Sequence, residues 1–134
     1  MPVRATRVRR AIAVLAAATL LPAGLLAATP SAASAASCTL QVNNPWLSSD
    51  GWAVYINGSG SAFCNSPVSV EMLIREDVSG WFDRTVTAGY GTSGQYIQRT
   101  APCWGPGWRN YYVEVRANGQ EAQSQRVAVN GDCG

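Results

Sequence analysis

Residues 68–75 have the sequence Val-Ser-Val-Glu-Met-Leu-Ile-Arg, in which every second residue from Val68 onward is apolar. Successive side chains of a β-strand point to opposite faces, so a period of two predicts a strand with one face in a core. This is the clearest strand pattern in the chain, and it places the protein among β-proteins.

Further short alternating runs lie on both sides of this strand. They predict strands at 38–42, 52–56, 61–64, 81–87, 111–117 and 122–130, and a weaker edge strand at 95–99. Two sets of turn-forming residues, Asn57-Gly58-Ser59-Gly60 and Asn118-Gly119, predict tight hairpins. Residues 89–94 hold three glycines and predict a flexible loop.

No stretch of helical length carries an apolar stripe with a period of 3.6 residues. About seven short strands in one domain predict an antiparallel β-sandwich of immunoglobulin-like or fibronectin-like type. A small closed barrel is the alternative. Among the large aromatic residues, we expect Trp52, Trp81 and Tyr111 to belong to the core.

Residues 1–36 have the features of a secretory signal peptide that is removed. Four arginines precede an apolar run from Ala11 to Ala28, and Ala33-Ser34-Ala35 fits an A-x-A cleavage site. The alternative, a membrane-spanning helix, is disfavoured because Pro22 interrupts the run and no charged flank follows it. We therefore expect a secreted, extracellular protein whose single domain spans residues 37–134.

Four cysteines in a small exported domain predict two disulfides, for which three pairings exist. Each cysteine lies near the end of a predicted strand, and antiparallel neighbours bring the start of one strand beside the end of the next. This favours Cys38–Cys64 and Cys103–Cys133. The rival is a Cys64–Cys103 bridge between sheets, as in antibody domains.

The composition excludes several kinds of chemistry. The chain has no histidine and no lysine, so it cannot form a Ser-His-Asp triad, a Ser-Lys dyad or a Schiff base. The cysteines do not occur in the close pairs typical of zinc sites. We expect no metal, no cofactor and no enzymatic activity. A hydrolase using carboxylates is the remaining alternative, but Glu71 and Glu114 are better explained as solvated charges near arginines.

The segment Cys103-Trp104-Gly105-Pro106-Gly107-Trp108 is the most distinctive in the chain. A stiff turn that presents two tryptophans suits stacking on sugars, or insertion into the cleft of a partner protein. The competing interpretation is that both indoles cap one end of the core. Trp46, which follows Asn44-Pro45, is a further candidate binding residue.

Removal of the signal peptide changes the net charge from +2 to −2, because four of the ten arginines lie in it. A mildly acidic domain without a basic run is not expected to bind nucleic acid, or a membrane after cleavage. We expect a monomer whose partner is an extracellular protein or a glycan.

In several features the chain resembles small secreted four-cysteine proteins of Streptomyces-like actinobacteria. These features are the positions of Cys38 and of the Gly-x-Gly before Cys64, the strand ending in Arg75-Glu76-Asp77, and the final Tyr…Gly…Ser…Val…Cys run. The resemblance covers nearly all of residues 37–134 and implies a secreted sandwich domain. That family supplies no active-site residues, so the residues themselves carry the functional hypothesis. We expect a non-catalytic binding domain, with a protease-inhibitor-like or toxin-like effector as the alternative.

Overall fold

The strand predicted at 68–75 is present as β4, Ser69–Asp77, in the computed structural model, which describes residues 36–134. Val70, Met72 and Ile74 are buried, as the alternation predicts. The signal peptide predicted for residues 1–36 lies outside the described residues, apart from Ala36.

Residues 36–134 form eight antiparallel strands and no helix, so no helix there is long and apolar enough to cross a membrane. The other seven strands are β1 Cys38–Val42, β2 Trp46–Ser49, β3 Val54–Cys64, β5 Arg84–Thr92, β6 Ile97–Ala117, β7 Gln120–Gln123 and β8 Val127–Cys133. All eight belong to one sheet, in the order β1-β3-β6-β4-β5, with β2 paired to β3 and with β7 and β8 paired to β6.

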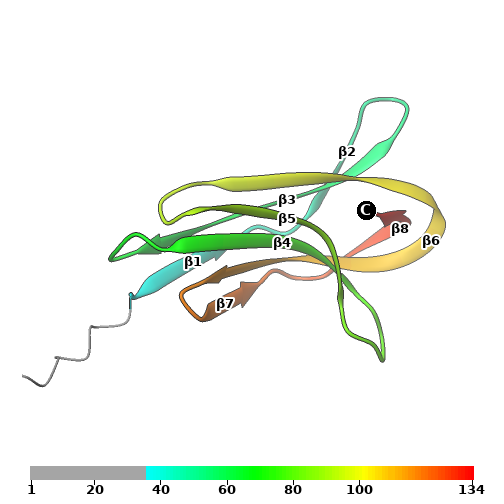
Figure 1. Ribbon diagram of the computed structural model, residues 1–134. Helices are drawn as coiled ribbons and strands as arrows, with labels where there is room; N and C mark the ends of the chain where they lie inside the picture. The colour runs from blue at the N-terminus through cyan, green and yellow to red at the C-terminus, as the bar shows by residue number, and fades with distance from the viewer. Residues whose placement is uncertain (1–35) are drawn as a thin grey trace, which may run out of the picture. The chain divides into compact units, whose positions relative to one another are not determined.

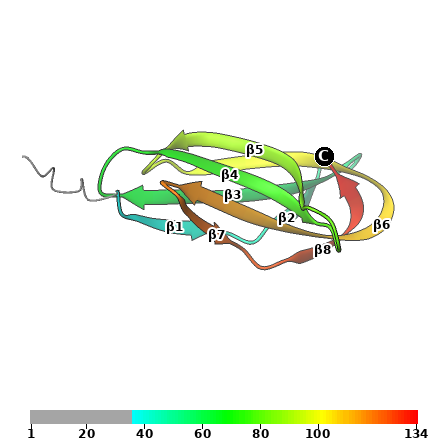
Figure 2. The same ribbon diagram turned by 60° about the horizontal axis from the view of Figure 1, so that its bottom comes forward.

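The long strand β6 organises this sheet. Its first half, Ile97–Cys103, pairs with β3, and its second half, Asn110–Ala117, pairs with β4. Figures 1 and 2 show β6, coloured yellow to orange, turning back on itself between these halves. The turn brings the β3 half of the sheet face to face with the β4 half.

The core lies between these facing halves. Ile56 and Ala62 of β3 are fully buried there, together with Ile74 of β4 and Val113 and Val115 of β6. Leu40 and Val42 of β1 pack against the edge of this cluster.

The hairpin turn predicted at Asn57-Gly58-Ser59-Gly60 is wrong, because these four residues form the middle of β3. A Cβ atom on Gly58 would lie 2.7 Å from Ile74 Cγ1 and 2.8 Å from Val113 Cγ2, and one on Gly60 would collide with Val115. The two glycines thus permit a close approach of the facing strands, which is a known use of glycine inside a strand. The predicted strands 52–56 and 61–64 are consequently one strand.

The boundaries of other strands also differ from the predicted ones. The predicted strand at 81–87 begins at Arg84 and continues through Gly89 and Gly91, so most of the predicted glycine loop is strand. The predicted edge strand at 95–99 is the beginning of β6, and the predicted strand at 122–130 is divided between β7 and β8. The Asn118-Gly119 turn is confirmed, with φ angles of 50° and 74°.

Both favoured disulfides, Cys38–Cys64 and Cys103–Cys133, are present, and the rival Cys64–Cys103 bridge is not. The all-β antiparallel class is confirmed. The narrower expectation of an immunoglobulin-like or fibronectin-like sandwich is not established by this topology.

Candidate binding surface

Trp104 and Trp108 flank the bend of β6. The pairing of β6 with β8 shifts between them, with Trp104 opposite Asp132 and Trp108 opposite Asn130. Gly105 and Gly107 have φ angles of 66° and 125°, which glycine adopts far more readily than other residues. The indoles are 58% and 74% exposed, so they do not cap the core.

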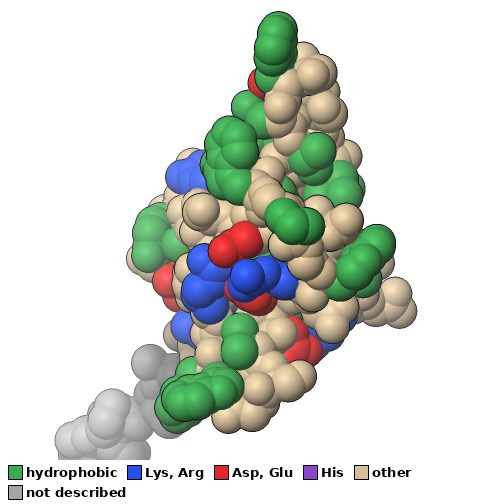
Figure 3. Space-filling model, turned by 90° about the vertical axis from the view of Figure 1, so that its right-hand side faces the viewer, with side chains coloured by type: hydrophobic (Ala, Val, Ile, Leu, Met, Phe, Trp, Pro, Cys, Tyr) green, Lys and Arg blue, Asp and Glu red, His purple; other side chains and the backbone are tan. Residues whose placement is uncertain are grey.

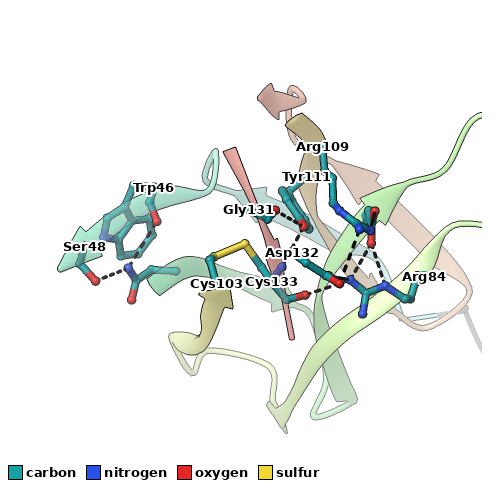
Figure 4. The surroundings of a disulfide bond; sticks show 11 residues. Trp46, Ser48, Arg84, Cys103, Arg109, Tyr111, Gly131, Asp132 and Cys133 are labelled. Carbon is teal, nitrogen blue, oxygen red and sulfur yellow. Dashed lines mark hydrogen bonds and ion pairs between the residues drawn. A yellow bond between two sulfur atoms is a disulfide. The ribbon is translucent and has the colours of Figure 1, made fainter. Parts of the chain in front are cut away.

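Several interactions fix this bend in place. The backbone N–H of Gly107 donates a hydrogen bond to Asn130 Oδ1 at 2.8 Å. Cys103, directly before the bend, is joined to Cys133, and the buried Tyr111 hydroxyl donates to the carbonyl of Gly131 at 3.0 Å (Figure 4). The backbone of the bend is therefore ordered before any ligand arrives, which limits the entropy lost on binding.

A cluster of paired charges lies beside the bend. The carboxylate of Glu76, only 4% exposed, accepts hydrogen bonds from Arg84 at 2.7 Å and from Arg109 at 2.8 Å. Arg84 also contacts Asp132 at 2.6 Å and donates to the carbonyl of Cys133 (Figure 4). The hydrogen bond and the negative charge of Glu76 raise the pKa of Arg109. The cluster joins β4, β5, β6 and β8 without a net charge.

Figure 3 views this end of the molecule and shows basic and acidic side chains in one cluster with hydrophobic side chains around it. Two tryptophans that we predicted to be core are exposed instead: Trp52 is 97% exposed and Trp81 is 81% exposed. That prediction is wrong for both, whereas it is confirmed for Tyr111, which is fully buried. Trp52 follows the bend at Asp50-Gly51, and Trp81 follows Gly80, so both lie in loops between strands.

The loop between β4 and β5 is also held at its base. Asp83 accepts hydrogen bonds from the Tyr112 hydroxyl at 2.6 Å and from the backbone N–H of Val78 at 3.2 Å. The Tyr112 hydrogen bond lowers the pKa of Asp83. Burial, together with that bond, raises the pKa of Tyr112 to about 12, so the phenol stays protonated and keeps donating at neutral pH.

The outward face of the β3 half carries almost no charge. From Ser37 to Val70 the sequence holds a single charged residue, Asp50, and the first half of β6 adds only Arg99, which donates to the carbonyl of Ala88 on β5. Gly58 and Gly60 face the core, so the odd-numbered residues of β3, which alternate with them, point to the opposite side of the strand. These outward residues are Tyr55, Asn57, Ser59, Ser61 and Phe63.

Amide and hydroxyl groups on this face, which we call the uncharged face, bond to one another. Asn57 donates to Ser48 Oγ at 2.8 Å and accepts from Thr100 Oγ1 at 2.7 Å, and thus connects β2, β3 and β6. Asn43 Nδ2 donates to Ser59 Oγ at 2.9 Å. Asn57 also donates to the carbonyl of Trp46, whose indole is 38% exposed at the edge of the face (Figure 4).

Trp46 and Trp104 both belong to the uncharged face. Trp46 is opposite Asn57, and Asn57 is opposite Thr100, so these residues form one row across β2, β3 and β6. Alternation along β6 places Trp104 on the same outward side of the strand as Thr100, four residues further along. Two of the three predicted binding residues thus share one face, and Trp108 lies on the bend beside it.

The outward face of the β4 half, in contrast, carries charged residues that form ion pairs. Glu114, 2% exposed, is paired with Arg116 and lies 3.8 Å from Arg75, so the expectation of a solvated charge is wrong for Glu114. Glu71 is partly exposed and lies 3.7 Å from Arg116. A cavity of about 550 Å³ opens on this half and is lined by Glu71, Tyr90, Arg116, Gln120 and Glu121, among others.

The carboxylates considered for catalysis take part in ion pairs. Glu71 and Glu114, the two carboxylates named as catalytic candidates, are both paired with Arg116. Within residues 36–134, no group of three or more acidic, cysteine or histidine residues is placed to hold a metal ion.

Comparisons of the chain with protein-family models, with curated proteins and with solved structures found no match.

Proposed function

We propose that this protein is a secreted, non-catalytic binding domain of immunoglobulin-like or fibronectin-like sandwich type. It uses the bend Trp104–Trp108, with Trp46 nearby, to contact an extracellular protein or a glycan. The observation that carries the proposal is the exposure of two indoles on a bend that a disulfide and the Gly107–Asn130 hydrogen bond fix in place. Exposed and rigid aromatic side chains are typical of binding surfaces, because they lose little freedom when a partner covers them.

The paired disulfides support the proposed compartment, since such bonds persist in oxidising environments outside the cytosol. The N-terminal pattern of basic, apolar and small residues agrees with export.

The second candidate function is that of an inhibitor whose bend enters the cleft of a partner enzyme. The specific observation in its favour is the disulfide-anchored bend itself, because a rigid loop can occupy a cleft without ordering cost. A panel of secreted proteases would separate this candidate from a glycan binder.

Replacing Trp104 and Trp108 together by alanine is expected to abolish binding to any ligand that contacts the bend. Each indole at the centre of an interface contributes about 2 kcal/mol or more, and the pair therefore changes affinity by about a thousandfold. The measurement is binding of the wild type and the variant to a glycan array and to the protease panel. The thermal midpoint should change little, since both side chains are mostly exposed.

The matched control is Trp52→Ala with Trp81→Ala, which removes two tryptophans from other loops that are even more exposed than those of the bend. This variant should retain binding. If it loses binding while the Trp104/Trp108 variant retains it, the bend is not the binding surface.

A further inference from the structure

We propose that the uncharged face binds an extended neutral polysaccharide chain. This inference rests on the proposed function and names the class of ligand for the same surface. It is carried by the contrast between the two outward faces. The β4 half is crossed by ion pairs, whereas β1, β2 and β3 contain no charged residue.

The chemistry of the uncharged face matches a polyhydroxylated ligand without charge. Amides and hydroxyls donate and accept hydrogen bonds with sugar hydroxyls at no electrostatic cost. An unpaired charge under such a ligand would have to lose water without compensation. Aromatic rings supply flat apolar surfaces against which the C–H faces of sugar rings pack, and Trp46 and Trp104 border this face.

The layout of the face favours a chain over a single sugar. The exposed polar side chains of the face lie on the strands at both sides of β3 and follow its length, because outward residues recur about every 6.6–6.8 Å along a strand. At the centre, Asn57, Ser59 and Ser61 are at most 5% exposed. Longer exposed side chains flank them on both sides, namely Gln41, Asn43 and Trp46 on one side and Gln98 and Thr100 on the other.

The polar groups are also ordered in advance. Both the amide nitrogen and the carbonyl oxygen of Asn57 are occupied by neighbours, which holds Ser48 and Thr100 in position. These two hydroxyls, together with the exposed amides of Gln41 and Gln98, remain available to a ligand at the surface. Fixed partners reduce the ordering cost of binding a flexible chain.

The test is an NMR titration of the secreted protein, with both disulfides intact, against cellohexaose and against N-acetylchitohexaose. We expect chemical-shift changes along β2, β3 and the first half of β6 with at least one of them. Trp46→Ala should weaken that binding by about tenfold or more, as truncation of a central aromatic does. Trp46→Phe should restore much of it, which distinguishes stacking from a folding defect.

Tyr90→Ala is the matched control, because Tyr90 is an aromatic residue on the β4 half that is more exposed than Trp46, at 70% against 38%. It should change the affinity less than about twofold, and the affinity should be the same in about 0.05 M and 0.5 M salt, because no ion pair forms. Shifts confined to the Tyr90 cavity, or strongly salt-dependent binding, would overturn the inference.

The absence of shifts at about 5 mM of both sugars, a concentration that reveals even weak complexes, would overturn it too. In that case a protein ligand that depends on Trp104 and Trp108 would leave the proposed function standing. A protein that binds neither the sugars nor the protease panel would count against both.

Discussion

Replacing Cys103 and Cys133 together by alanine is expected to lower the free energy of unfolding by about 3–4 kcal/mol, with roughly 3.7 kcal/mol from loop closure alone. The bond closes a loop between residues 30 positions apart, so its loss enlarges the unfolded ensemble. Both cysteines are buried, at 8% and 0% exposure, and they pair beside the buried Tyr111 hydroxyl. A domain of this size gains only a modest net stability from its core, so the loss is a large share of the total.

Urea unfolding of the purified variant, followed by circular dichroism, measures this effect. Replacing Cys38 and Cys64 together is the matched comparison, since that bond closes a loop of similar length at the partly buried opposite edge. We expect the Cys103/Cys133 variant to be the less stable of the two. A loss below about 1 kcal/mol would mean that the native network around Tyr111 and Arg84 holds the strands without the bond.

Gly58→Ala is expected to destabilise the domain by about 2 kcal/mol or more, because the added methyl group has no space. It would lie 2.7 Å from Ile74 Cγ1 and 2.8 Å from Val113 Cγ2, and both of these residues are fully buried. The facing strands must then separate or rotate their side chains, which disturbs the packing between the two halves of the sheet.

Two further variants test the cause of this effect. Val113→Ala opens space next to Gly58, so in the double variant the cost of Gly58→Ala should fall, which a double-mutant cycle of unfolding free energies measures. Gly80→Asn serves as a control, since Gly80 is exposed, an added Cβ atom there would meet no other atom within 4 Å, and its φ of 76° is one that asparagine tolerates. Additive costs for Gly58→Ala and Val113→Ala would contradict the proposed close approach.

Gly58 shows where sequence patterns were sufficient to predict the strands and where they were not. Alternation identified β4 and the second half of β6, because each has one face in the core. It failed in β3, where Asn57-Gly58-Ser59-Gly60 has the composition of a turn but forms a buried strand. A local pattern cannot show that a glycine is required by strands far away in the sequence.

The disulfides were predicted by a partly incorrect route. Cys38 does pair with Cys64 across antiparallel strands, but β1 joins β3 directly, without the hairpin that we expected at Asn57. The predicted disulfide pairing was nevertheless correct, because the positions of the strand ends, rather than those of the turns, determine which cysteines meet. The second bridge followed the expected geometry, with Cys103 opposite Cys133 in the pairing of β6 with β8.

The candidate surface was only partly visible in the sequence. Trp104 and Trp108 were identified from their Gly-Pro-Gly spacer, whereas Trp52 and Trp81 were assigned to the core on residue type alone. The adjacent Asp50-Gly51 and Ser79-Gly80 were the signals that these tryptophans lie in loops. The near absence of charge from Ser37 to Val70 was also readable, but its meaning depends on three strands sharing one outward face.

Hydroxyl-radical footprinting with mass spectrometry tests the central claim, that the aromatic bend and its neighbouring face form the binding surface. In the free protein, Trp104 and Trp108 should be oxidised readily while the buried Tyr111 is protected. Addition of a ligand recovered from the glycan or protease screen should protect Trp104, Trp108 and Trp46 and leave Tyr90 unchanged. Slow oxidation of both bend tryptophans in the free protein, or ligand protection confined to Tyr90, would contradict the account.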